Sequence, residues 1–317
     1  MVSDNEIKEY DIPILFVCFN RLEIAKKSFE AIVQVKPKKI YIACDGAREN
    51  KSGEKEKVNK VRENILKMIT WECEVKTLFQ EKNLGCSQGV YTAINWLFSH
   101  EEKGIILEDD CVPNQSFFIF MKEMLNKYIT DDRIAMVSGF NPYAKKENNK
   151  EVSYYFSKFK SCWGWGTWKR AWKNMDLNLR CLDGNYKDDI ILNMGYNKEF
   201  TQNYWKYRLK LIELNEVSAW DWQWYISTSS QSQYAILPIE NLVSNIGFGV
   251  EATHTNSKKL PEYTLTGKLD FPLKHPLYIV PNYTLEKIIE KSNNLIVERI
   301  KWFIPIKLKN VLKKIIR

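Results

Sequence analysis

The sequence has few histidines, no Cys-x-x-Cys pair and no long apolar run. Its 3 histidines are scattered and offer no ligand cluster, which argues against a zinc site. The 7 cysteines are odd in number and cannot all pair within one chain, so we expect free thiols in a reducing cytoplasm. No segment approaches the ~18 consecutive apolar residues of a membrane span, and the polar N-terminus leads us to expect no signal peptide.

Positive charge is concentrated at the C-terminus. The formal net charge is +8, and residues 295–317 contain seven basic residues but a single acid, Glu298, so the rest of the chain is nearly neutral. A nucleic-acid-binding protein usually carries its positive charge on the folded surface, so we expect no nucleic-acid partner. From Pro305 the pattern predicts a basic amphipathic helix that docks on an anionic membrane surface. The alternative is a helix that packs on the protein and leaves its lysines in water.

Short apolar runs alternate with amphipathic segments over the first 140 residues. This alternation predicts an α/β fold, in which a mainly parallel sheet is flanked by helices. With 44% hydrophobic and 27% charged residues, the 317-residue chain is typical of a folded protein of one or two domains. The expected strands are 13–19, 39–43, 74–79, 104–107 and 134–137, and the expected helices are 22–33, 54–69, 87–98 and 117–128.

Three consecutive acids, Glu108, Asp109 and Asp110, follow the apolar run 104–107. Like charges at a strand end are costly unless a cation or a ligand balances them, and hard divalent metals that bridge phosphates prefer oxygen ligands. The run therefore indicates a metal-dependent site for a phosphorylated ligand, with a solvent-exposed acidic turn as the alternative. Ligands of parallel sheets bind beyond the carboxyl ends of the strands. Three other polar tips would converge there: residues 20–21, 45–46 and 83–85.

Aromatic residues become dense after Gly139, and no internal repeat is evident. We therefore expect a first part at residues 1–140, an aromatic-rich part at 141–256, and an extension at 257–317 that carries the basic helix. Seven short motifs occur in order between residues 12 and 256: Phe16–Arg21, Ala43–Gly46, Asn83–Gly85, Glu108–Asp110, Cys162–Trp168, Ala219–Trp222 and Asn245–His254.

With these motifs the chain resembles the GT-A glycosyltransferases, more narrowly the branch of N-acetylglucosaminyltransferase I and its bacterial sugar transferase relatives. The resemblance implies a Rossmann-like nucleotide-sugar-binding half at 1–140 and an acceptor-binding, catalytic half at 141–256. It implies that Phe19, Asn20 and Arg21 hold the base and ribose, and that Asp45 accepts a hydrogen bond from the base, which favours uracil. Free backbone N–H groups at a helix start favour anions, so the phosphate side is expected at two residues: Asn83 and Gly85.

In the same resemblance the acidic triplet is the metal motif. Asp110 would be the direct ligand of Mn²⁺ or Mg²⁺, and Asp109 and Glu108 would contact the ribose and the transferred sugar. A metal in this position bridges the diphosphate and stabilises the leaving group as its charge grows. Ligation by oxygen alone does not choose between the two metals.

Asp221 matches the catalytic base of the inverting enzymes. The reaction needs one carboxylate on the acceptor side to take the proton of the attacking hydroxyl. The flanking Trp220 and Trp222 could stack on a sugar ring and raise the pKa of the acid by desolvation. The alternative is an aromatic helix face with an exposed Asp.

Two further segments take roles from the resemblance. Trp163–Trp168 would form an aromatic floor below the donor sugar or the acceptor. Direct contact is expected for Trp163, Gly164 and Trp165, although tryptophans at this density more often pack in a core. Residues 247–254 would form a loop that closes over the diphosphate, with two glycines, Gly247 and Gly249, providing mobility and His254 contacting phosphate or metal. A lone histidine is more often structural.

Together these inferences predict a metal-dependent, inverting glycosyltransferase that moves a sugar from a UDP-sugar to a glycan or lipid-linked acceptor. UDP-N-acetylglucosamine is the leading donor, and bacterial surface polysaccharide, lipopolysaccharide or glycoconjugate assembly is the expected setting. We expect the protein at the inner face of the cell membrane. Two alternatives remain. A nucleotidyltransferase would show a glycine-rich loop after the first strand, where residues 19–22 contain no glycine. A non-catalytic carbohydrate-binding protein would bind glycan without nucleotide or metal.

Overall fold

The computed structural model describes residues 10–144, 151–218, 220–247 and 265–293. The expected basic helix at 295–317, Gly249 and His254 lie outside the described residues. Within the described residues, no helix combines the length and the apolar character needed to cross a membrane.

The central element is an eight-stranded sheet in the order β3-β2-β1-β4-β8-β6-β9-β7. β1 to β4 run parallel to one another, β8 lies antiparallel between β4 and β6, and β7 is antiparallel to β9. The α/β class with a mainly parallel sheet is therefore confirmed. The strands are β1 (Ile14–Cys18), β2 (Lys39–Cys44), β3 (Glu74–Phe79), β4 (Lys103–Glu108), β6 (Ile134–Ser138), β7 (Tyr154–Ser157), β8 (Trp165–Trp168) and β9 (Tyr234–Pro238).

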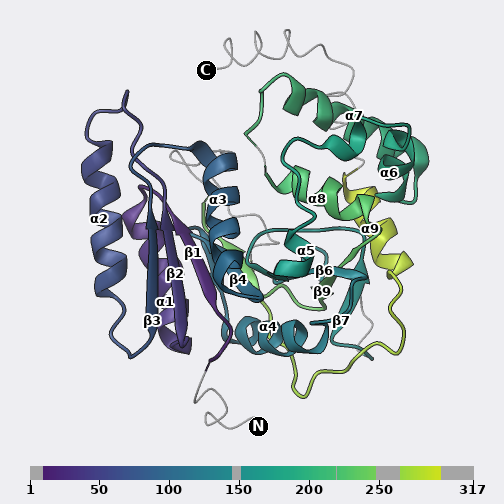
Figure 1. Cartoon of the computed structure of the whole chain (residues 1–317). Coiled ribbons are helices and arrows are strands. Elements are labelled where there is room, and N and C mark those ends of the chain that lie inside the picture. The colour runs from purple at the N-terminus through teal and green to yellow at the C-terminus, as the bar shows by residue number, and fades with distance from the viewer. Residues whose placement is uncertain (1–9, 145–150, 219, 248–264, 294–317) are drawn as a thin grey trace.

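Helices cover both faces of this sheet (Figure 1). Helices lie on both sides because β1, β2 and β4 bury side chains on both faces: Phe16 of β1 enters one core and its neighbour Leu15 the other. On the face of Phe16 lie α1 (Leu22–Val35), α2 (Glu54–Lys67) and α4 (Gln115–Lys127), and on the face of Leu15 lie α3 (Gly85–His100), α5 (Lys169–Trp172) and α8 (Asp221–Ser230).

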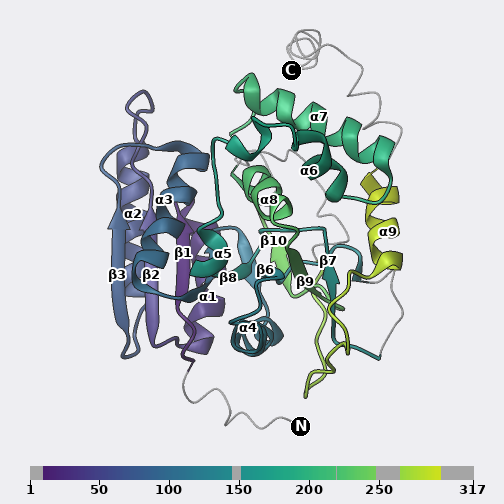
Figure 2. The same ribbon diagram turned by 45° about the vertical axis from the view of Figure 1, so that its right-hand side comes forward.

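The remaining helices form a layer around α8. α6 (Lys187–Asn193) and α7 (Lys198–Glu213) share a small apolar core with α8, and α9 (Tyr283–Asn293) packs on β7 and β9 through Leu285 and Ile289. A 3₁₀ turn, Arg180–Leu182, precedes α6. Figure 2 shows α6, α7 and α9 grouped beside α8, away from β1 to β3. This layer supplies the second wall of the site described below.

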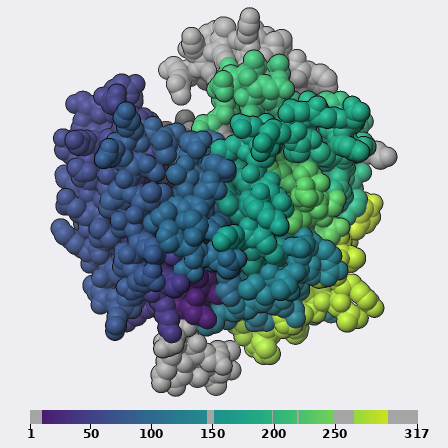
Figure 3. Space-filling view, viewed as in Figure 1, coloured from purple at the N-terminus to yellow at the C-terminus, as the bar shows by residue number. Residues whose placement is uncertain are grey.

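β8 was not expected from the sequence. We interpreted Trp163–Trp168 as a floor under a ligand, but Trp165–Trp168 is a strand of the main sheet, paired with both β4 and β6. The segment is short and lacks a β-branched run, so its strand character follows from the two neighbours that it pairs with. Because β8 pairs with β4, the sheet continues across the boundary that we placed at residue 140, and Figure 3 shows the two parts abutting along one surface.

A second, two-stranded sheet lies where the acidic triplet ends. β5 (Cys111–Pro113) pairs antiparallel with β10 (Val243–Asn245), with Cys111 opposite Asn245. The register therefore brings Asn245, more than a hundred residues away in sequence, next to Asp110. The carboxyl ends of β1 to β4 share one edge of the main sheet, as the expected convergence of polar tips requires.

Candidate functional site

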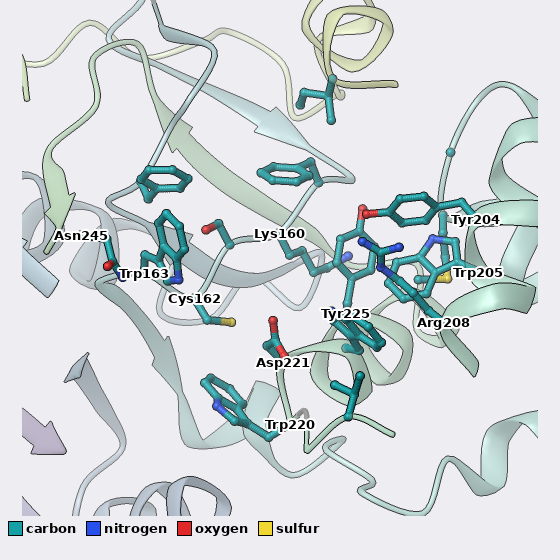
Figure 4. Close-up of a pocket in the computed structure, with 18 of the residues that line it drawn as sticks. Lys160, Cys162, Trp163, Tyr204, Trp205, Arg208, Trp220, Asp221, Tyr225 and Asn245 are labelled. Carbon is teal, nitrogen blue, oxygen red and sulfur yellow. The ribbon is translucent and has the colours of Figure 1, made fainter. Parts of the chain in front are cut away.

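A cavity of about 540 Å³ opens at this edge of the sheet. It extends from the acidic triplet to the layer formed by α6, α7 and α9, and Asp221 at the start of α8 lines it between these ends. Figure 4 shows Asp221 between Cys162 and Trp220, with Asn245 on one side and Arg208 on the other. A space of this volume between two substructures is typical of small-molecule sites.

Arg21 binds two members of the triplet. Its Nη2 donates to Asp109 Oδ1 and, at 3.0 Å, to Asp110 Oδ2, and its Nε lies 3.4 Å from Asp109 Oδ2. Ser28 of α1 donates to the backbone oxygen of Asp109 at 2.7 Å. Asp109 is buried and faces Arg21, whereas Asp110 and Glu108 line the cavity. Of the three acids, one is therefore buried in the protein and two are available to a ligand in the cavity.

Negative charge is in excess at this end of the cavity. Burial, together with the charges of Asp110, Asp109 and Asp221, raises the pKa of Glu108 to about 8. Burial also raises the pKa of Asp109 to about 6, against the opposing effect of Arg21. Within the described ranges, carboxylates outnumber the guanidinium groups that contact the triplet, and carboxylate oxygens are the ligands that hard divalent cations prefer.

Asp110, which the resemblance assigns to the metal, lies at the edge of the cavity, and its role as a ligand stays a prediction. Its Oδ1 accepts a hydrogen bond from Asn245 Nδ2 at 3.2 Å, and its backbone oxygen accepts one from Ile246 N at 2.9 Å. A Cβ on Gly247 would lie 2.2 Å from Asp110 Oδ2, so any larger residue at this position would force the Asp110 side chain to move. Among the described residues, no group of three or more His, Cys, Asp or Glu side chains could hold a metal. A metal at Asp110 would therefore need further oxygen ligands from a bound diphosphate and water.

Asp45 has a different environment from the expected one. Its carboxylate accepts hydrogen bonds from Leu84 N at 2.9 Å, from Gly85 N at 2.9 Å and from Asn83 Nδ2 at 3.0 Å. The expectation of a free Gly85 N–H is wrong, because Asp45 occupies it and stabilises the start of α3. Asp45 follows β2, so its hydrogen bonds connect the end of β2 to the loop between β3 and α3. Its role in recognising a base stays a prediction, as do the roles of Asn83 and Gly85.

Residues after β1 are tied to α2. Asn20 Nδ2 donates to Glu54 Oε1 at 2.9 Å, and the Arg48 guanidinium lies 5.6 Å from the ring of Phe19. Arg48 also forms an ion pair with Glu54, and these contacts lower the pKa of Glu54 to about 2. Arg48 and Glu54 therefore position Phe19 and Asn20. Neither Arg48 nor Glu54 could be identified from the sequence pattern, because their contacts join segments that are distant along the chain.

Asp221 is the first residue of α8 and is exposed to the cavity. Trp220 before it is buried and stacks on Trp165 with ring centroids 5.7 Å apart, which fixes the start of the helix. Trp222 after it lines the cavity. The charge of Asp221 contributes to the raised pKa of Glu108, so the two side chains lie close enough to interact across the cavity.

The aromatic segment divides between cavity and core. Trp163 lines the cavity and packs on Phe140, with ring centroids 4.6 Å apart. Trp165 has 0% exposed surface and faces Trp220 and Trp224, so the expected contact of Trp165 with a sugar is wrong in this structure. Gly164 has φ 62° and packs on Val243. Its contact with a ligand stays a prediction.

The far end of the cavity contains residues that the sequence reasoning missed. Lys160, Tyr204, Arg208 and Tyr225 line it, and none belongs to the seven motifs. The signal available in the sequence was weak: Tyr204 and Arg208 are four residues apart, a spacing that places two side chains together on a helix.

Comparison with known proteins finds similar solved structures only. No protein-family profile matches the chain, and no curated protein matches it. One similar structure is the mannosyltransferase PcManGT from Pyrobaculum calidifontis in complex with GDP-Man and Mn²⁺, with 9% identity, a TM-score of 0.37 and coverage of 71% of this chain and 70% of that one. The glycosyltransferase GlyE of Streptococcus pneumoniae TIGR4 has 11% identity and a TM-score of 0.29, over 61% of this chain and 43% of that one.

A third structure is not a glycosyltransferase. It is the 4-diphosphocytidyl-2C-methyl-D-erythritol synthase from Anaerococcus prevotii DSM 20548, with 7% identity and a TM-score of 0.33, over 62% of this chain and 84% of that one. At such scores the likeness carries no functional argument. The proposals below therefore rest on the residues of this chain.

Proposed function

We propose that this protein is a metal-dependent glycosyltransferase of the GT-A type that uses a nucleotide sugar as its donor. The observation that carries the proposal is the pairing, in one cavity, of a carboxylate cluster at the end of β4 with a separate exposed acid, Asp221, at the start of α8. Transfer of a sugar from a diphosphate needs both parts, a cation site on the leaving-group side and a base on the acceptor side.

The donor would bind along the ends of β1, β2 and β4. Phe19, Asn20 and Arg21 would hold the base and ribose, with UDP as the leading nucleotide and UDP-N-acetylglucosamine as the leading donor. Asp110 would hold Mn²⁺ or Mg²⁺, which when bound neutralises the diphosphate and the charge that grows on the leaving oxygen. Arg21, which now balances Asp109 and Asp110, would keep Asp109 paired while Asp110 turns to the cation.

Asp221 would act on the acceptor. Its carboxylate accepts the proton of the acceptor hydroxyl while that oxygen forms a bond to the anomeric carbon and the bond to the diphosphate oxygen breaks. Attack from the side opposite the leaving group inverts the configuration at this carbon. The exposure of Asp221 to the cavity and the packing of Trp220 on Trp165 support this role, because a base must be reachable and fixed in place.

The experiment that tests the proposal is a screen of donor binding to the full chain. Thermal shift is measured with UDP-sugars, GDP-sugars and CMP-sugars, each with Mn²⁺, with Mg²⁺ and with a chelator. We expect stabilisation by one nucleotide class that depends on the metal. Stabilisation by an oligosaccharide alone, with no response to any nucleotide, would contradict the proposal and favour a carbohydrate-binding protein.

We further propose that the acceptor is a surface glycan or lipid-linked saccharide and that the protein docks on the inner face of the cell membrane. Support comes from the basic sequence at 295–317 and from the exposure of Leu277, Tyr278 and Val280. Flotation with vesicles of anionic lipid tests it: replacing Lys309, Lys313 and Lys314 by Gln should reduce binding about a hundredfold, since each of the three cations contributes ~1 kcal/mol. Equal flotation of the variant would contradict membrane docking.

A further inference from the structure

We propose that the acceptor carries an anionic group, a carboxylate or a phosphate, and that Arg208 binds this group. The inference rests on the proposed glycosyltransferase function and names the chemical class of its second substrate. It starts from the distribution of charge along the cavity. Glu108, Asp110 and Asp221 line the end at the sheet, whereas the cations Lys160 and Arg208 line the part that faces α7. Figure 4 shows Arg208 on the side of Asp221 away from Asn245, and Lys160 above Asp221 with its side chain extending toward the Arg208 side.

Arg208 is held by aromatic rings. Its guanidinium carbon lies 3.6 Å from the centre of the Tyr204 ring and 4.8 Å from that of Trp222. Within the described part of the chain, Arg208 makes no ion pair with a carboxylate. Stacking on aromatic faces orients a guanidinium but leaves its N–H groups at the edge of the plane available. These N–H groups form a fork that matches the two oxygens of a carboxylate or phosphate.

Lys160 adds a second cation on the same side of the cavity. It is buried, and its Nζ donates to the Lys158 carbonyl at 3.2 Å and to Ser229 Oγ at 3.1 Å, above the Tyr225 ring. A charged lysine has three N–H donors, so one remains for a ligand. Burial lowers the pKa of Lys160 to about 7, and a bound anion would favour its charged form.

Two acids also line this end, and both are occupied. Glu286 accepts hydrogen bonds from Ser157 Oγ at 2.6 Å and from Lys158 N at 2.7 Å. Glu290 accepts from Asn197 N at 3.1 Å. Neither acid pairs with Arg208, so the guanidinium is not neutralised by the walls of its own cavity in the described residues.

The position of Arg208 relates the anion to the reaction. The ring of Trp222, on which Arg208 stacks, belongs to the residue that follows Asp221. An acceptor anchored by its anionic group at Arg208 would therefore extend along Trp222 toward Asp221. The anion could be the carboxylate of an acidic sugar or the phosphate of a phosphorylated sugar or lipid carrier.

The test compares three methyl glycosides that differ only at C6: methyl glucoside, methyl glucuronoside with its free carboxylate, and methyl glucoside 6-phosphate. Binding to the full chain is measured by tryptophan fluorescence and isothermal titration, with UDP and Mn²⁺ present. We expect one or both anionic probes to bind at least about tenfold more tightly than methyl glucoside. The tighter of the two identifies carboxylate or phosphate as the source.

Arg208→Gln should abolish this preference, and Arg208→Lys, which keeps the charge but loses the fork, should retain part of it. Lys206→Gln, an exposed cation on the same helix, is the matched control and should leave the preference unchanged. Equal binding of neutral and anionic probes, or an anionic preference that survives in Arg208→Gln, would overturn the inference.

A titration of UDP with Mn²⁺ on the same samples separates the two proposals. Normal UDP binding without an anionic preference overturns the role of Arg208 and leaves the glycosyltransferase proposal intact. An anionic preference that depends on Arg208, without any nucleotide binding, supports the Arg208 site and overturns its assignment as an acceptor site of a glycosyltransferase.

Discussion

Arg21 Nη2 lies 3.0 Å from Asp110 Oδ2 and also donates to Asp109, so one guanidinium joins the loop after β1 to the acidic triplet after β4. The two acids use it differently. Asp109 is buried against Arg21, with a side chain that is 7% exposed, whereas the Asp110 side chain is 20% exposed and borders the cavity. Arg21 is thus a structural partner of Asp109 and a replaceable partner of Asp110.

Arg21→Met should destabilise the protein by about 3–5 kcal/mol, because it leaves the buried Asp109 carboxylate without its cation. Urea unfolding followed by tryptophan fluorescence measures the effect. The double variant Arg21→Met with Asp109→Asn should recover much of the loss, since the uncompensated charge is then absent. If the loss of stability in the double variant equals the sum of the losses in the two single variants, the pairing of Arg21 with Asp109 is contradicted.

Asp110→Asn should retain stability and lose metal-dependent nucleotide binding. The amide keeps the size of the side chain, and the change relieves repulsion among the neighbouring carboxylates. We expect the stabilisation by UDP with Mn²⁺ to disappear in thermal shift. Asp188→Asn, an exposed acid of α6 outside the cavity, is the matched control and should behave like the unmodified chain. Unchanged Mn²⁺-dependent binding in Asp110→Asn would show that another group holds the metal.

Asp45→Ala should reduce stability by about 1–3 kcal/mol, because Leu84 N and Gly85 N lose their acceptor. Chemical denaturation compares it with Asp183→Ala, an exposed acid whose removal should change stability by no more than about 0.5 kcal/mol. A variant that is as stable as the Asp183 control but no longer binds UDP would instead support the base-recognition role.

Lys160→Met should change the pH dependence of stability. The pKa of Lys160 is lowered by burial from 10.5 to about 7, so between these values the unfolded chain binds a proton that the native protein does not. Native stability then rises with pH by about 1.4 kcal/mol per unit in this range. We expect the gain in stability from Lys160→Met to be largest at pH 7 and below, and to shrink by pH 9. A gain in stability that is constant from pH 6 to pH 9 would contradict the lowered pKa of Lys160.

The part of the fold that depends on local pattern could be predicted from the sequence. The expected strand at 39–43 lies within β2, and the expected run at 104–107 lies within β4, because apolar runs of this length bounded by polar tips carry their own signal. β8 was missed because a Trp-Gly-Thr-Trp segment acquires strand structure only from pairing with β4 and β6. Trp165 was therefore assigned to a ligand instead of the core.

In the candidate site, too, local patterns could be predicted and contacts between distant segments could not. The convergence of the triplet with residues 20–21 follows from the parallel topology, so a sequence pattern can predict it. Two other contacts could not be predicted, because they join residues that are far apart in the sequence and share no repeating pattern. Asp45 caps residues 84–85, and Arg208 stacks on Trp222. Arg208 in particular lies on a helix that the motifs did not include, and only packing of α7 on α8 brings it to the cavity.

The most direct measurement is UDP release from the UDP-sugar that binds, with Mn²⁺ and an extract of membrane glycolipids as the source of acceptor. Asp221→Asn should bind the donor as the unmodified chain does and lower the rate by about 10²- to 10⁴-fold, since it removes the base and keeps the shape of the side chain. Asp188→Asn should leave the rate unchanged. Full turnover by Asp221→Asn would contradict its role as the base, and absence of turnover of any nucleotide sugar by the unmodified protein would contradict the glycosyltransferase proposal.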